Sequence, residues 1–173
     1  MKTKDKLIIL LSHPIDSLFH KLLKSFYKSS TTINRLVNYK RFDIHPTVKF
    51  WHDTRIYGNG KIYIGKGTYF GHYTFIVAFN NTKISIGENC AISHGVHIRT
   101  ADTNVDSHKN KIKEKKTGNI LIGNNVWVGA NVFITAGVTI GDNVAIGANS
   151  VVTKSFGDNC VIAGSPAKII KEL

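Results

Sequence analysis

The side chains best suited to proton transfer are three histidines, His94, His97 and His108, which fall close together in the middle of the chain. An imidazole titrates near neutral pH, so it can take a proton from a hydroxyl group and act as a general base. His108 lies in residues 101–118, a polar and lysine-rich stretch inside an otherwise regular sequence. Loops on a rigid scaffold commonly carry function, so we expect chemistry in this stretch.

The composition is that of a folded protein rather than a disordered one. The chain has 173 residues, of which 42% are hydrophobic and 20% charged, and this predicts one globular domain. Residues 7–11 are the apolar run nearest the start, and they lack the length of a membrane span and the cleavage site of a secretory signal. We therefore expect a cytoplasmic protein. Cys90 and Cys160 lack C-x-x-C spacing, so we expect two small buried groups rather than a disulfide or zinc site.

The net charge of +12 is concentrated in two segments. Residues 1–41 hold nine Lys or Arg against two Asp, and residues 107–117 hold five Lys against one Glu, which together give +7 and +4 of the total. A duplex-binding protein would spread its phosphate contacts over a face, and no nucleic-acid-binding motif is visible. The sequence therefore predicts no nucleic-acid partner.

A six-residue period runs through most of the chain, and its first position is always Ile, Val or Phe. The positions are Ile64, Phe70, Ile76, Ile86, Ile92, Ile98, Ile122, Val128, Ile134, Ile140, Ile146, Val152, Phe156 and Ile162. This position and the one two residues earlier alternate with outward residues, which is typical of short strands. A helix is excluded because apolar residues do not recur at spacings of three and four.

The fourth position of the period is nearly always Gly or Asn. The positions are Gly67, Asn89, Gly95, Asn125, Asn131, Gly137, Asn143, Asn149 and Asn159, with Tyr73 and Ala101 as exceptions. These two residue types enter positive φ at the lowest cost, so a left-handed backbone turn is predicted about every six residues. Short strands joined by such corners stack into a prism with one continuous core, as in a solenoid.

Three phrases in the sequence resemble the hexapeptide-repeat acyltransferases. They are residues 126–132 (VWVGANV), residues 146–154 (IGANSVVTK) and residues 163–170 (AGSPAKII). The resemblance covers residues 43–171 and is closest to the sugar and polysaccharide O-acetyltransferases of surface-glycan assembly. It implies an all-β fold, a left-handed parallel β-helix with three hexads per coil. It also implies a homotrimer that binds acetyl-CoA in a cleft between subunits, a sugar or glycan acceptor, and no metal.

The same resemblance implies roles for individual residues. Trp127, Asp102 and Asn104 would contact the acceptor, and Lys154 and Lys168 would lie near the phosphates of the coenzyme. Four small residues would let the coenzyme approach backbone N–H groups closely. They are Gly129, Ala130, Gly147 and Ala148.

The loop departs from the family pattern at the position of the general base. Related enzymes open this loop with Arg-Thr-Ala-Asp/Asn-His-Asn, whereas this chain has Thr103 or Asn104 where the histidine is expected. Three alternatives follow: His108 swings in from a rearranged loop, His97 or His94 serves instead, or no base is needed because the acceptor is an amine or catalysis is absent. A zinc carbonic anhydrase on the same coil needs three histidines, and the H-x4-H spacing is missing.

The N-terminal segment, residues 1–42, is predicted to contain an amphipathic α-helix. Its apolar residues between 14 and 27 follow one helical face, and Ser12 and Pro14 suit its start. Two alternatives remain for this face: packing on the open end of the prism, where it would cover strand edges, or lying on the anionic inner face of the membrane.

The expected function is transfer of acetyl from acetyl-CoA to a sugar hydroxyl in capsule, O-antigen or lipopolysaccharide-type glycan synthesis. N-acetylation of a nucleotide-linked amino sugar is one alternative, and it agrees with the missing loop histidine because a neutral amine needs less help from a base. A catalytically silent scaffold is the other.

Overall fold

The computed structural model describes residues 21–22, 41–108 and 114–173, except for the side chains of Asp106 and His108. The chain divides into two compact units, Met1–Val37 and Asn38–Leu173. Lys21 and Leu22 are helical; the rest of the predicted amphipathic helix lies outside the described residues. Within the described residues, no helix is both long enough and apolar enough to cross a membrane.

The second unit is built from three parallel sheets. The first sheet has the order β1 (Asp43–Ile44), β4 (Lys61–Ile64), β7 (Lys83–Ile86), β12 (Ile120–Ile122) and β15 (Thr139–Ile140). The second sheet has the order β2 (Lys49–Phe50), β5 (Tyr69–Phe70), β8 (Ala91–Ile92), β13 (Trp127–Val128), β16 (Ala145–Ile146), β18 (Cys160–Gly164) and β19 (Ala167–Glu172). The third sheet has the order β3 (Arg55–Gly58), β6 (Phe75–Ala78), β9 (His97–Arg99), β14 (Phe133–Ile134) and β17 (Val151–Val152).

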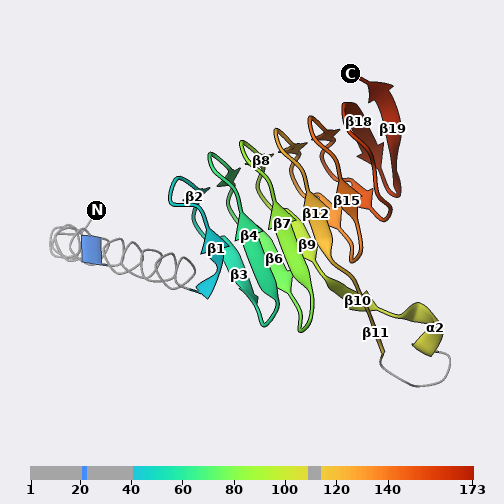
Figure 1. Cartoon of the computed structure of the whole chain (residues 1–173), viewed down its shortest axis with the longest axis horizontal. Helices are drawn as coiled ribbons and strands as arrows, with labels where there is room; N and C mark the ends of the chain where they lie inside the picture. Colours follow the sequence, from blue (N-terminus) through green and yellow to red (C-terminus); the bar gives the residue numbers. More distant parts are fainter. Residues whose placement is uncertain (1–20, 23–40, 109–113) are drawn as a thin grey trace, which may run out of the picture. The chain divides into compact units, whose positions relative to one another are not determined.

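The chain visits the three sheets in turn, so each set of three strands makes one coil of a solenoid (Figure 1). We call the turn from the first sheet to the second the first corner, the turn from the second sheet to the third the second corner, and the turn back to the first sheet the third corner. Neighbouring strands in these sheets are parallel except for β18 and β19, which pair antiparallel. The fold is a left-handed parallel β-helix, as the resemblance implies.

The core is the column of side chains at the first position of the period. All fourteen predicted residues are buried, and the most exposed of them, Phe156, is 7% exposed. The register stacks them directly, as in Ile64, Ile86, Ile122 and Ile140 of the first sheet. Strands of two residues bury little by themselves, so the column through all coils is what holds the fold together.

The corners confirm the prediction from the fourth position. All nine predicted Gly and Asn residues have positive φ, between 55° for Asn89 and 86° for Gly137. Tyr73, which breaks the Gly/Asn pattern, has the same conformation with φ of 57°. The stacked backbone therefore imposes the corner on a bulky side chain as well. Ala101 does not turn, because it begins β10 (Ala101–Thr103), where the chain leaves the coil.

The gap in the period between Ile98 and Ile122 contains a two-stranded hairpin. β10 pairs antiparallel with β11 (Lys115–Thr117), and α2 (Val105–His108) follows β10. The hairpin closes where the N–H of Gly118 donates to the carbonyl of Thr100 at 3.0 Å. Figure 1 shows β10 and β11 projecting from the side of the coil.

Candidate functional site

Backbone N–H groups at the first corner are capped by side chains from the next coil. The N–H of Glu88 donates to Oδ1 of Asn124 at 2.9 Å, and the N–H of Asn124 donates to Oδ1 of Asp142 at 2.6 Å. The N–H of Asp142 donates in the same way to Oδ1 of Asp158 at 2.7 Å. These backbone donors are therefore occupied within the protein.

The second corner has alanine at the equivalent positions. Ala130 and Ala148 occupy the same place in adjacent coils, because Val128 pairs with Ile146. A methyl group accepts no hydrogen bond, and within the described part of the chain the N–H groups of Ala130 and Ala148 have no partner. The second corner thus presents two backbone donors one strand spacing apart, about 4.8 Å.

Gly129 and Gly147, also predicted to bind the coenzyme, have a packing role in the structure. Their N–H groups donate to the carbonyls of Ile146 and Ile162, both at 2.8 Å. A Cβ on Gly129 would lie 2.6 Å from the backbone nitrogen of Ala148, so a larger residue would separate the coils. The glycines therefore hold the alanine corner in its tight stacking, and their contact with a coenzyme stays a prediction.

Trp127 lies on the outer side of the second sheet and is 50% exposed. Its neighbours in the register are Ala91 on β8 and Ala145 on β16, and the next residue beyond Ala91 is the exposed Tyr69. Because only methyl groups flank it, the indole is accessible from both sides. The backbones of Tyr69 and Trp127 lie two strand spacings apart, about 9 to 10 Å.

His97 is held in a stack of rings on the third sheet. Its imidazole lies between the rings of Phe75, at a centroid distance of 4.8 Å, and Phe133, at 5.8 Å, with interplanar angles of 20° and 14°. Both faces of the imidazole are covered. Only the ring edge, which carries the two nitrogens, is left to meet another molecule.

The other two candidate bases lie in different surroundings. His94 is exposed at the second corner, one coil before Ala130, and its carbonyl accepts from the N–H of Asn131 at 3.0 Å. His108 ends α2 on the hairpin, and its side chain is outside the described residues. The structure therefore places His94 next to the alanine corner and His97 on the adjoining sheet.

The hairpin residues predicted to contact the acceptor also organise the loop. Oδ2 of Asp102 accepts from the N–H of Ala136 at 2.9 Å. The N–H of Asn104 donates to the carbonyl of Glu114 at 3.0 Å, and the carbonyl of Asn104 accepts from the hydroxyl of Ser107 at 2.6 Å. Thr103, next to both, is exposed on β10.

The two predicted phosphate-binding lysines are both exposed. Lys168 lies on β19 opposite Ala163, and Ala163 packs against Gly147, so Lys168 stands near the end of the row that contains Ala130 and Ala148. Lys154 follows β17 at the third corner, with its Nζ 5.5 Å from the ring centre of Phe156. The structure thus brings Lys168 closer than Lys154 to the alanine corner.

Among the side chains that the structure describes, the cysteines and acidic residues do not form a second chemical centre. Burial raises the pKa of the Cys90 and Cys160 thiols, which favours their neutral form, and both are buried as predicted. Among residues 41–108 and 114–173, no group of three His, Cys, Asp or Glu side chains is placed to hold a metal ion.

Sequence reasoning missed three residues of this region, Tyr69, Phe75 and Phe133. Each occupies the outward position just before a core residue, as do Trp127 and His97. That shared position was the available signal. It becomes informative only when the register shows which outward residues of different coils are neighbours.

Comparison with known proteins agrees with the architecture. The family model described as bacterial transferase hexapeptide (six repeats) matches residues 119–154. A polysialic acid O-acetyltransferase from Escherichia coli O1:K1 / APEC is 43% identical over 131 residues, which are 74% of this chain and 42% of that protein. The chain spans about half the length of the curated relatives that it matches.

Two solved structures extend the match over most of the coil. A maltose O-acetyltransferase from Clostridium difficile 630 has a TM-score of 0.68 at 29% identity and covers 88% of each chain. A galactoside acetyltransferase in complex with coenzyme A has a TM-score of 0.62 at 30% identity, over 84% of this chain and 82% of that one. With its six-residue period, its stacked core and its positive-φ corners, this chain belongs to the bacterial transferase hexapeptide family.

Proposed function

We propose that this protein is an acetyltransferase that moves acetyl from acetyl-CoA to a sugar hydroxyl, in the synthesis of a capsule, O-antigen or lipopolysaccharide-type glycan. The observation that carries the proposal is the second corner. There the N–H groups of Ala130 and Ala148, which have no partner among the described residues, follow β13, which bears the exposed Trp127, and the neighbouring strand β16. The named O-acetyltransferases among its relatives support it. Assembly as a homotrimer, with the donor between two subunits, is part of the proposal.

The alanine corner suits the coenzyme arm, which carries amide carbonyls along an extended chain. Those carbonyls would accept from the N–H groups of Ala130 and Ala148, and the small side chains would allow the close approach. Lys168 and Lys154 would supply point charges for the phosphates. Acetyl-CoA supplies the acetyl group as an activated thioester.

The second sheet suits a sugar. Sugar rings present C–H faces that pack against aromatic rings, and Trp127 and Tyr69 offer two such rings on one side of the sheet. Asp102 and Asn104 are the acceptor residues on the hairpin. Because Oδ2 of Asp102 is bonded to the coil, its other oxygen is the one available to a sugar hydroxyl.

Transfer to a hydroxyl requires a base that takes the proton as the sugar oxygen attacks the acyl carbon, and donors that stabilise the negative charge on the acyl oxygen. His108 and His97 are the candidates for the base. The stacked ring of His97 supports its candidacy, since Phe75 and Phe133 restrict its orientation. His94, next to the alanine corner, is the third choice.

One observation favours a second candidate function. Thr103 or Asn104 occupies the place of the loop histidine, and an amine acceptor that arrives deprotonated has less need of a base. N-acetylation of a nucleotide-linked amino sugar is therefore the first alternative function. A scaffold without catalysis is the second.

The test measures the release of the coenzyme A thiol from acetyl-CoA in the presence of an acceptor. Two sets of acceptors are compared, hydroxy sugars and amino sugars of the same ring type. We expect turnover with a hydroxy sugar, and loss of that turnover in Trp127→Ala. Leu121→Ala, which removes an exposed apolar side chain from the first sheet, is the control. Turnover with amino sugars alone would replace O-acetylation by N-acetylation, and absence of coenzyme A binding would support the scaffold.

A further inference from the structure

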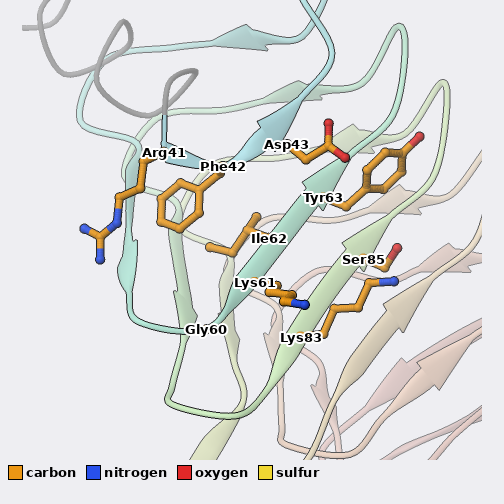
Figure 2. A pocket seen from close by; sticks show the side chains of 9 residues that line it. All are labelled: Arg41, Phe42, Asp43, Gly60, Lys61, Ile62, Tyr63, Lys83 and Ser85. Carbon is orange, nitrogen blue, oxygen red and sulfur yellow. The ribbon is translucent and has the colours of Figure 1, made fainter.

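The first sheet carries a pocket of about 680 Å³ that the proposed transfer reaction does not use. It is lined by residues of β1, β4 and β7, together with Arg41, Phe42 and Gly60 (Figure 2). Trp127 lies on the second sheet, His97 on the third, and Asp102 on the hairpin. The pocket therefore belongs to a different face of the coil.

Two lysines define the charge of this pocket. Lys61 and Lys83 are directly opposite each other in the parallel register of β4 and β7, and both are exposed. Figure 2 shows their side chains over these adjacent strands. Like charges placed opposite each other in a sheet repel. Neither ammonium group forms an ion pair with any residue that the structure describes.

A third cation stands at the margin of the pocket. Arg41 donates from Nη2 to the carbonyl of Gly58 at 2.6 Å and to Oδ1 of Asn59 at 3.2 Å, so its guanidinium is fixed in place. Asp43 is the only carboxylate among the described lining residues. Three cations against one carboxylate leave a net charge of +2, which matches a dianion better than a singly charged carboxylate.

The remaining lining residues add two hydroxyl groups. Tyr63 and Ser85 pair in the same register as the two lysines, two residues further along β4 and β7. Their hydroxyls can donate to an anion held by the ammonium groups. Phe42 and Ile62 also line the pocket, but both belong to the hydrophobic core and are only 8% and 3% exposed. Figure 2 shows both of them next to Arg41 and Lys61.

We propose that this pocket binds a phosphate or diphosphate group, with Lys61 and Lys83 as the charged ligands and Tyr63 and Ser85 as hydrogen-bond donors. Lysine binds phosphate as a point charge, and two lysines side by side match the charge of a phosphate dianion. A soluble phosphorylated compound and a lipid headgroup share this chemistry. The inference does not depend on the proposed acetyl transfer.

The first arm of the test titrates the full-length protein with inorganic pyrophosphate by isothermal titration calorimetry. We expect saturable binding that weakens with added salt, and about tenfold or greater loss of affinity in the double variant Lys61→Gln/Lys83→Gln. The matched control is Lys49→Gln/Lys66→Gln, which removes two exposed lysines outside the pocket. Equal loss in both double variants, or no saturable binding by the unmodified protein, would overturn the proposal.

The second arm separates the two sources of the phosphate. Flotation is compared on vesicles of phosphatidylcholine alone and of phosphatidylcholine with phosphatidic acid. The proteins are the three of the first arm, together with Ser85→Ala. Loss of flotation in Lys61→Gln/Lys83→Gln only would support the pocket and assign it a lipid headgroup. Unchanged flotation, with weakened pyrophosphate binding, would support the pocket and assign it a soluble ligand. Circular dichroism verifies that each variant is folded.

Discussion

Oδ2 of Asp102 accepts a hydrogen bond of 2.9 Å from the backbone N–H of Ala136, and this bond joins the hairpin to the coil that follows it. Asp102 lies on β10, while Ala136 lies at the third corner, 34 residues later in the chain. The bond sets where the hairpin leaves the prism. It therefore positions Thr103 and Asn104, which follow directly on the same segment.

Replacement of Asp102 by Ala should loosen the hairpin. It leaves the half-buried N–H of Ala136 without its charged acceptor, so we expect a loss of about 1–3 kcal/mol in the free energy of unfolding and faster hydrogen exchange at that amide. Glu88→Ala is the control, because Glu88 is an exposed carboxylate outside the pocket and its removal should change stability by less than about 0.5 kcal/mol. Unchanged exchange at Ala136 would show that the bond does not hold the hairpin.

The stacked core can be tested at Ile134, which is fully buried on β14. Ile134→Ala should lower the free energy of unfolding by about 2–5 kcal/mol, because the column leaves no flexible neighbour to fill the cavity. Leu121→Ala, at a 41% exposed position, should cost less than about 0.5 kcal/mol. Denaturant unfolding measures both. A loss below about 1 kcal/mol at Ile134 would contradict the core assignment.

Substitutions at the corner residue Asn143 separate the contribution of its backbone conformation from that of its side-chain hydrogen bonds. Its φ is 56°, and its amide lies between Asn125, which donates to it at 3.2 Å, and Asn159, which accepts from it at 2.9 Å. Both Asn143→Gly and Asn143→Ala remove the amide ladder, but only the alanine variant keeps a Cβ at positive φ. We expect the free energy of unfolding of Asn143→Ala to be about 1–2 kcal/mol lower than that of Asn143→Gly, as measured by thermal unfolding. Equal stability would mean that the corner does not require positive φ.

The general base can be assigned by comparing three histidine variants. We expect His108→Ala to lower kcat for a hydroxy sugar by about 10²- to 10⁴-fold, with a much smaller effect on an amino sugar. His97→Ala and His94→Ala provide the comparison. A loss confined to His97→Ala would move the base to the third sheet, where Phe133→Leu should then shift the pH profile of kcat as well. Full activity in all three variants would exclude these three histidines as the base.

The basic segment of residues 1–41 gives a prediction for membrane binding. Removing the charges of Lys21, Lys24 and Lys28 by substitution with Gln should weaken binding to anionic vesicles about fivefold per lysine, because each contributes about 1 kcal/mol near the surface. Flotation at low and high salt measures the effect. If the triple variant floats as well as the unmodified chain, the segment does not act as a membrane anchor.

The core and the corners could be predicted from sequence because both depend on local residue type. A buried column requires Ile, Val or Phe at a fixed period, and a positive φ favours Gly or Asn, so each hexad carries its own signal. Tyr73 shows the limit of this reasoning. Its corner is imposed by the coils on either side, and its own residue type gives no sign of it.

The candidate site was less predictable, because its geometry depends on which coils are neighbours. The period lapses between Ile76 and Ile86 and again between Ile98 and Ile122, so the register across these gaps is not visible in the sequence. Without that register, the alignment of Tyr69 with Trp127 and of Phe75 with His97 is hidden. The contrast between the capped first corner and the uncapped second corner likewise appears only when successive coils are superposed.

The antiparallel pairing of β19 with β18 has a consequence for self-association. A stack of near-identical coils is a template for its own growth, since the last rung of one molecule resembles the first rung of another. A strand running in the opposite direction offers the wrong polarity to an incoming parallel rung. The antiparallel strand β19 thus ends the parallel pairing of the second sheet, and this disfavours end-to-end association of these molecules into fibres.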